Sequence, residues 1–393
     1  MTEKRVKSMI GKVFNDIAYG IETGQFGNKV RVGITTLGSE LGIDNIVKGA
    51  EIAQKRDASL EVVLIGPKVD SKLTQVIADG EEEGYREMER LLDNGEIDAC
   101  VTMHYNFPIG VSTVGRVITP GLGREMFIAT TTGTTSAHRV EAMIKNGING
   151  IIAAKAMGIE NPTVGLLNVD GVRQVERAFK ELDSRGYPIN LVESSRADGG
   201  FPMRGNDLLK GTPDIMVSDT LTGNILMKLF SSYTTGGSYE SQGYGYGPGI
   251  GEGYSRIVLI LSRASGSPVV ANAINYGADL VKGNIKEIIN KEFEKANRAG
   301  LKDILEDITR ESVGRAKEEE ISPPPSETVT ETISGIDIME LEDAVQVLWK
   351  NDIYAESGMG CTGPVILVND SKLNKAMEVL ISSGYDLGDS NIC

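Results

Sequence analysis

Residues that build disulfide frameworks and metal centres are scarce in this chain. Its 393 residues include 3 cysteines and 2 histidines, and Cys100, Cys361 and Cys393 lie far apart in the sequence. A disulfide framework needs more and closer cysteines, and a structural zinc site needs a cluster of cysteine and histidine ligands. We therefore expect a reduced, cytoplasmic protein without metal or cofactor, in which Cys100, within an apolar run, is a core thiol.

Basic surface and long apolar segments are lacking as well. Lysine and arginine number 40 against 55 aspartates and glutamates, which gives a net charge of −15. Duplex-binding surfaces rely on clustered lysine and arginine, and anionic membranes repel acidic proteins. No apolar run approaches the roughly 18 residues of a membrane-spanning helix, and the first residues lack the apolar core of a signal peptide. These absences argue against nucleic-acid and membrane partners.

Glycine, by contrast, is abundant, and the apolar residues alternate between strand and helix patterns. The chain has 47 glycines but only 5% aromatic residues, a composition that fits an α/β protein with many turns. Residues 29–34 and 61–67 predict two strands, and between them Ile46, Val47 and Ala50 recur at helical spacing. Strand–helix–strand units of this kind build a parallel sheet.

Breaks in composition indicate how the chain divides. Its 393 residues exceed what one hydrophobic core usually serves. We predict a discontinuous first α/β domain at residues 1–115 and 255–315, and a second α/β domain at residues 116–254. A linker rich in proline and glutamate follows at residues 316–332, and a small C-terminal α/β module at residues 333–393. Residues 233–254 are rich in glycine and tyrosine without an apolar period, and we interpret them as a lid or an interface loop.

Hydroxyl-bearing residues and glycines gather in three segments that follow predicted strands. The segments are Thr132, Gly133, Thr134 and Thr135; Thr222, Gly223 and Asn224; and Ser265, Gly266 and Ser267. Amides at helix N-termini, helped by hydroxyl donors, bind anions without a fixed charge. Open α/β sheets bind ligands at the carboxyl ends of strands, so the three segments together favour a phosphate-type site, although each alone also fits plain turn chemistry. His104 and His138 are candidate supporting residues.

One cysteine stands among glycines, in Gly358-Met359-Gly360-Cys361-Thr362-Gly363-Pro364, just before the apolar run 365–368. Glycines let a ligand approach closely, and the amides of Gly360, Thr362 and Gly363 could stabilise a thiolate or an oxyanion. Such a thiol suits a covalent acyl carrier. A tight turn that enters a strand fits the same residues, and these residues alone leave both interpretations open.

Residues 161–168 and 205–228 resemble the phosphate acyltransferases, which make acyl phosphates from acyl carrier protein thioesters in phospholipid synthesis. The resemblance covers roughly residues 30–300 and implies a two-domain architecture related to phosphotransacetylases and isopropylmalate dehydrogenases, with the active site in the cleft between the domains. His104-Tyr105-Asn106 replaces the family's Asn-Thr-Gly turn, so the substrate should differ from a long-chain acyl carrier protein.

The whole chain, including the turn around Cys361, resembles the alpha subunits of component C of the glycine/sarcosine/betaine reductase complex. That resemblance implies a hetero-oligomer with a component C beta subunit, and a carboxymethyl group delivered by selenoprotein A. It also implies an acetyl thioester on Cys361, which inorganic phosphate, as substrate, converts to acetyl phosphate. The alternatives are a phosphate acyltransferase acting on an acyl carrier protein or coenzyme A thioester, and a non-catalytic scaffold subunit.

Overall fold

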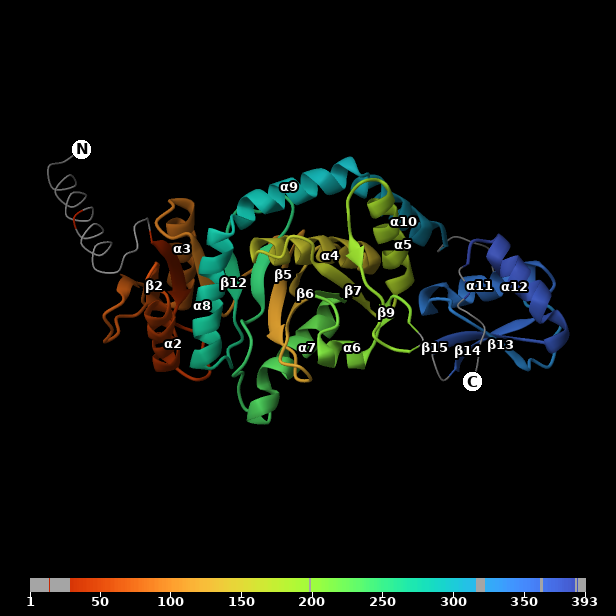
Figure 1. Ribbon diagram of the computed structural model, residues 1–393, viewed down its shortest axis with the longest axis horizontal. Helices are drawn as coiled ribbons and strands as arrows, with labels where there is room; N and C mark the ends of the chain where they lie inside the picture. The colour runs from red at the N-terminus through yellow and green to blue at the C-terminus, as the bar shows by residue number, and fades with distance from the viewer. Residues whose placement is uncertain are drawn as a thin grey trace.

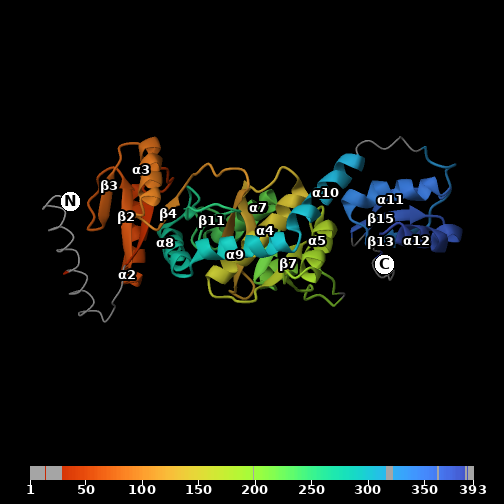
Figure 2. The same ribbon diagram turned by 90° about the horizontal axis from the view of Figure 1, so that it is seen from above.

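The computed structural model is an elongated α/β protein with a small α/β module at one end, as predicted (Figure 1). It describes residues 14, 29–197, 199–315, 322–360, 363–385 and 387. A first lobe, a central lobe and the C-terminal module follow one another along the long axis in both views (Figures 1 and 2). None of the helices within the described ranges is long and apolar enough to cross a membrane.

The first lobe is a parallel sheet between two layers of helices. Its strands are, in spatial order, β3 (Thr74–Ile77), β2 (Leu60–Gly66), β1 (Val30–Thr35), β4 (Ala99–Thr102) and β12 (Val258–Ile260). Alternate residues of β2 belong to different cores, because successive side chains of a strand point to opposite faces. Val62 and Leu64 share a core with α2 (Ile43–Arg56) and α8 (Ser267–Lys282), whereas Val63 and Ile65 pack with α3 (Glu81–Asp93).

The central lobe continues the same sheet. Its strands are β11 (Gly247–Ile250), β5 (Val111–Ile118), β6 (Glu125–Thr134), β10 (Ile215–Val217), β7 (Thr163–Leu167) and β8 (Asn190–Leu191), and β9 (Pro202–Met203) also pairs with β7. Its helices are α4 (Arg139–Ala156), α5 (Val172–Ser184), α6 (Gly205–Lys210), α7 (Thr220–Ser232), the 3-10 turn η1 (Tyr233–Thr235), α9 (Ile285–Arg298) and α10 (Leu301–Arg315). Helices α4 and α7 both contact β6, and α9 and α10 lie over α4 (Figure 1). Within the predicted range 255–315, β12 and α8 thus lie in the first lobe, and α9 and α10 pack on the central lobe.

The glycine- and tyrosine-rich segment is not a lid, which corrects the expectation for residues 233–254. It contains β11, which pairs antiparallel with both β12 and β5 and so joins the two halves of the sheet. Gly247 permits this close strand approach: its φ is 85°, and a Cβ there would lie 1.7 Å from the carbonyl oxygen of Val114. Because glycines replace apolar side chains at this crowded position, the strand has no apolar period in the sequence.

The C-terminal module is an antiparallel sheet covered by helices, with a core of its own. Its elements are β13 (Glu331–Ser334), α11 (Ile338–Lys350), β14 (Ala355–Gly360), β15 (Gly363–Val368), the 3-10 turn η2 (Asp370–Lys372) and α12 (Leu373–Ser382). Leu348 of α11 and Leu380 of α12 are buried in one cluster with Ile366 of β15. Ile381, the next residue of α12, has apolar character that would favour burial but is 59% exposed.

Candidate functional site

A cleft of about 510 Å³ opens where strands of the two lobes meet. It lies at the carboxyl ends of β4, β6 and β12, beside the first half of α7, which is where open α/β sheets place ligand sites. The polar side chains and glycines that line it are His104, Asn106, Thr132, Gly133, Thr134, Asn224, Lys228, Ser262 and Arg263. Four segments far apart in the sequence therefore share one cavity wall.

The charge of this cleft differs from that of the chain. The sequence carries a net charge of −15, yet no aspartate or glutamate is among the described residues that line the cleft. Its charged residues are the cations Lys228 and Arg263. Within the described ranges Arg263 forms no ion pair, and its backbone carbonyl accepts a hydrogen bond from the Glu40 amide at 2.8 Å. The cleft therefore offers positive charge and hydroxyl donors to an anion.

The first predicted hydroxyl segment lies mostly in a strand and not in a turn. β6 continues to Thr134, because Thr134 and Gly133 pair with Val111 and Ser112 of β5. Thr132, Gly133 and Thr134 line the cleft, whereas the buried Thr135 faces α4 and donates a hydrogen bond to Asn146 Oδ1 at 2.9 Å. Helix α4 begins at Arg139, once this hydrogen-bonded segment has ended.

The second segment forms the first turn of α7. Asp219 caps this helix, since its carboxylate accepts hydrogen bonds from the Thr222 amide at 3.1 Å and the Thr222 hydroxyl at 2.6 Å. Burial acts to raise the pKa of Asp219, but these hydrogen bonds and the ion pair with Arg139 outweigh it and lower the pKa. Asp219 thus occupies the anion-binding end of α7, and of this segment only Asn224 lines the cleft.

Asn224 reaches the cleft because α7 packs unusually close to β6. A Cβ on Gly223 would lie 1.8 Å from the Thr130 carbonyl oxygen, so a larger residue would push the helix away. The Asn224 amide donates a hydrogen bond to the Thr131 carbonyl at 2.9 Å, which fixes its side chain at the cleft wall.

The third segment lies behind the cleft. The hydroxyl of Ser265 donates to the Glu240 carboxylate at 2.9 Å, and the Gly266 amide donates to the Glu240 carbonyl at 2.8 Å. Gly266 is the N-cap of α8, and Ser267 is its first residue. The cleft is lined instead by Ser262 and Arg263, which precede this segment.

The two histidines occupy different environments. His104 is exposed and lines the cleft at the end of β4. His138 caps α4, where its Nδ1 accepts a hydrogen bond from the Glu141 amide at 3.4 Å, and it does not line the cleft. Of the two histidines, therefore, only His104 is placed to contact a ligand in the cleft.

Lys228 was not among the predicted site residues. It follows Asn224 by four residues, and side chains at that spacing share one face of a helix. Its ammonium group lies 2.8 Å from the Ser262 hydroxyl and 3.1 Å from the Glu240 carboxylate. The helical spacing from Asn224 was the available signal, but the sequence did not show which face of α7 meets β12.

The predicted acyl-carrying position falls outside the described residues, as do Thr362 and Cys393. On either side of Cys361, Gly360 of β14 pairs with Gly363 of β15. Gly363 and Pro364 line a second cavity, of about 430 Å³, between the module and the central lobe, together with Arg173 and Arg204. The two cavities share no lining residue. Cys100 is fully buried, as predicted, and burial raises the pKa of its thiol.

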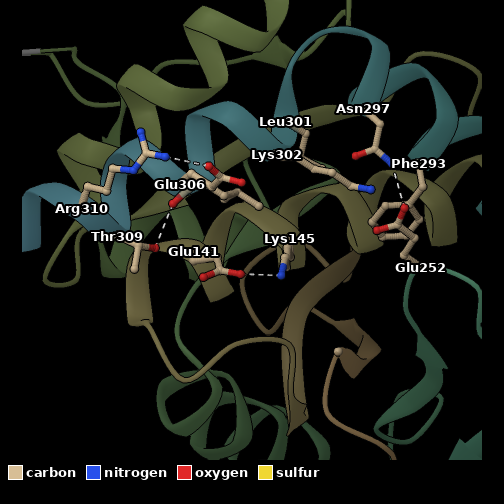
Figure 3. Close-up of a pocket in the computed structure, with 12 residues that line it drawn as sticks. Glu141, Lys145, Glu252, Phe293, Asn297, Leu301, Lys302, Glu306, Thr309 and Arg310 are labelled. Atoms are coloured by element: carbon tan, nitrogen blue, oxygen red, sulfur yellow. Dashed lines mark hydrogen bonds and ion pairs between the residues drawn. The ribbon is translucent and has the colours of Figure 1, made fainter. Parts of the chain in front are cut away.

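A third cavity, of about 900 Å³, is larger than the cleft but contains none of the predicted residues (Figure 3). It lies between α4, α9 and α10, with Phe293, Leu301 and Leu305 among its lining residues. Lys145 and Glu141, which form an ion pair at 2.5 Å, also line this cavity. The choice of the cleft as the candidate site therefore does not rest on its volume. It rests on the position of the cleft at the carboxyl ends of strands and on the charge of its lining residues.

Comparison with known proteins identifies the family to which this chain belongs. A family model described as fatty acid synthesis protein matches residues 30–367. The glycine/sarcosine/betaine reductase complex component C subunit alpha of Peptoclostridium acidaminophilum is 63% identical over 379 residues, which is 96% of this chain and 98% of that protein.

More distant relatives match a smaller part of the chain. A phosphate acyltransferase of Thermotoga petrophila is 27% identical over 237 residues, or 51% of this chain and 67% of that protein. The crystal structure of a branched-chain phosphotransacylase from Enterococcus faecalis V583 covers 64% of this chain and 99% of its own, with 17% identity and a TM-score of 0.43.

Proposed function

Because the chain belongs to the fatty acid synthesis protein family, close to a component C alpha subunit, we propose that it is an acyl-transfer subunit that forms acetyl phosphate. The observation that carries this proposal is the cleft without carboxylates in a protein with a net charge of −15. Inorganic phosphate fits such a site, where Lys228 and Arg263 supply charge and Thr132, Thr134 and Asn224 supply polar groups.

The proposed reaction is attack of phosphate on a thioester. The Cys361 thiol carries the acetyl group as a thioester, and this group derives from a carboxymethyl group delivered by selenoprotein A. In that conversion the carbon–selenium bond breaks, the selenium and a thiol are oxidised to a selenide–sulfide and so supply the two electrons, and one carboxylate oxygen leaves as water. A phosphate oxygen attacks the thioester carbonyl, the carbon–sulfur bond breaks, and the products are acetyl phosphate and the Cys361 thiolate. Amides of Gly360, Thr362 and Gly363 are the proposed oxyanion donors, each worth on the order of 3 kcal/mol in well-studied enzymes.

The proposed setting is a hetero-oligomer in the cytoplasm, with a component C beta subunit and selenoprotein A as partners. The relative with 63% identity is a named subunit of a multi-component reductase complex, which supports assembly with other chains. A reducing compartment keeps the thiol of Cys361 free for acylation.

Replacement of the carrier thiol tests this proposal. Cys361→Ala should abolish both acetyl phosphate formation and the arsenate-dependent breakdown of acetyl phosphate, because each needs the thioester. Cys393→Ala is the matched control and should keep both activities. Retained activity in Cys361→Ala would exclude the carrier role.

A second candidate is a phosphate acyltransferase that uses an acyl carrier protein or coenzyme A thioester directly. The position of the module favours it, since Gly363 and Pro364 line the second cavity and not the carboxylate-free cleft. In that case a chain that ends before residue 333 should retain phosphate-dependent cleavage of acetyl-coenzyme A, whereas the carrier mechanism predicts its loss.

A further inference from the structure

Behind the cleft lies a fully buried carboxylate that contacts three side chains. Glu240 is 0% exposed and precedes β11. Its carboxylate accepts hydrogen bonds from the Ser265 hydroxyl at 2.9 Å and the Tyr246 hydroxyl at 3.3 Å. The third partner is Lys228 on α7, whose ammonium nitrogen is 3.1 Å away. A buried charge of this kind persists only with partners that compensate its desolvation.

Among the described residues, Lys228 is the only cation in an ion pair with this carboxylate. Tyr246 remains protonated, because burial first and the nearby Glu240 second raise the pKa of its phenol. The Lys228 side chain is half exposed, with its ammonium group between Glu240 and the Ser262 hydroxyl, and Ser262 itself lines the cleft. The carboxylate is buried while its cation reaches the cavity.

We propose that Glu240 is a positioning residue that holds the Lys228 ammonium group at the cleft wall, where it binds the inorganic phosphate of the proposed reaction. An unpaired lysine has four rotatable side-chain bonds and loses most of that freedom when it binds a ligand. The fixed contacts to Glu240 and Ser262 remove this freedom before phosphate arrives. The inference rests on the proposed phosphate role of the cleft.

Glu240 also stabilises the local structure, and the experiment must distinguish this role from the positioning of Lys228. Its carboxylate accepts the hydrogen bond of the Ser265 hydroxyl, so Glu240→Ala would leave that buried hydroxyl without its acceptor and disturb the turn before α8. Glu240→Gln keeps the volume and an acceptor for Ser265 but removes the charge that attracts Lys228. Ser265→Ala is the matched control, because it removes a hydrogen bond to Glu240 and leaves the ion pair in place.

Equilibrium dialysis of the full chain with radiolabelled inorganic phosphate measures the effect directly. Glu240→Gln and Lys228→Gln should each weaken phosphate binding about tenfold, since each removes a charge-assisted contact. The double variant should bind phosphate no more weakly than Lys228→Gln alone, because the effects of substituting two residues that act as one unit do not add. Ser265→Ala should keep the dissociation constant of the unmodified protein even if it lowers thermal stability.

The outcomes separate this inference from the proposed function. Unchanged phosphate binding by Glu240→Gln would overturn the positioning role. Tighter binding would overturn it as well, since it would mean that the carboxylate only reduces the positive charge that Lys228 offers to phosphate. Additive losses in the double variant would overturn it too. If the unmodified chain binds phosphate but forms no acetyl phosphate, the proposed function fails while the positioning role stands; absence of phosphate binding overturns both.

Discussion

The carboxylate of Asp337, in the C-terminal module, accepts a hydrogen bond from the backbone amide of Gly171 at 3.3 Å. Gly171 is the N-cap of α5 and has no side chain to cap the helix, so a residue more than 160 positions later takes that place. Asp337 also accepts from the Arg173 amide at 3.4 Å, and Glu340 pairs with Arg177 beside it. Two buried carboxylates thus dock the module on α5: Asp337 at the positive N-terminal end of the helix, and Glu340 on the Arg177 side chain.

Loss of the Asp337 charge should loosen this docking. Asp337→Asn should speed hydrogen exchange at the Gly171 and Arg173 amides at least several-fold, because asparagine offers one acceptor oxygen where the carboxylate offers two, and it lacks the negative charge that the helix N-terminus attracts. Glu378→Gln, at an exposed position of α12, should change neither amide. Equal exchange in the two variants would show that other contacts hold the module.

Gly247 should tolerate no side chain. Gly247→Ala should lower the free energy of unfolding by about 3 kcal/mol, since a Cβ would lie 1.7 Å from the Val114 carbonyl oxygen. Gly253→Ala has a similar positive φ, 72°, but open space around it, and should cost only about 1 kcal/mol. Urea denaturation of both variants measures the difference, and equal losses would mean that backbone conformation alone decides the cost.

Arg263 should contribute to phosphate affinity. Under the proposed function, Arg263→Gln should raise the KM for phosphate roughly tenfold or more and change kcat less, because the charge of Arg263 would contact phosphate in the ground state as well. Lys302→Gln removes an exposed cation at the 900 Å³ cavity and should leave both constants unchanged. If Arg263→Gln lowers kcat with an unchanged KM, Arg263 acts on the transition state and not on phosphate binding.

Stability in acid should depend on Asp207. Burial acts to raise its pKa, but hydrogen bonds from the Ser195 and Arg204 amides and from the Ser194 and Thr212 hydroxyls outweigh it and bring the pKa to about 2. The unfolded value is about 3.9, so the contribution of Asp207 is complete above roughly pH 4 and is lost as the pH falls toward 2.

Asp207→Asn should therefore lower the free energy of unfolding near neutral pH by about 2 kcal/mol. Its deficit should shrink as the pH falls from about 4 to about 2, as denaturation curves at several pH values would show. The exposed Asp303→Asn is the control and should show no such trend. A deficit that is constant with pH would mean that the charge of Asp207 is not stabilising.

Cys100 should be inert in the folded protein. Its thiol is fully buried and burial raises its pKa, so limiting iodoacetamide should label it only after unfolding. Mass spectrometry of the labelled peptides should find Cys361 modified first if that residue is the acyl carrier. Early labelling of Cys100 would contradict both its burial and the assignment of the reactive thiol.

Sequence patterns predicted the elements whose stability is local. The alternation around Val62 and the helical spacing of Ile46 and Ala50 predicted a parallel first lobe, because period and propensity act within a few residues. The same reasoning failed for β11, where Gly247 fits a strand only because Val114 lies opposite. It also could not distinguish Thr132, which lines the cleft, from Thr135, which faces α4.

The sequence by itself determined the acidic α/β character, the scarcity of thiols and the hydroxyl-rich segments after strands, since these depend on composition and short-range pattern. Tertiary structure alone decided which of those segments share a cleft. Asp219 closes the N-terminus of α7, Glu240 holds Ser265 behind the wall, and Lys228 meets Ser262 across two lobes. Long-range contacts of this kind depend on how helices pack on the sheet, and no local spacing in the chain encodes them.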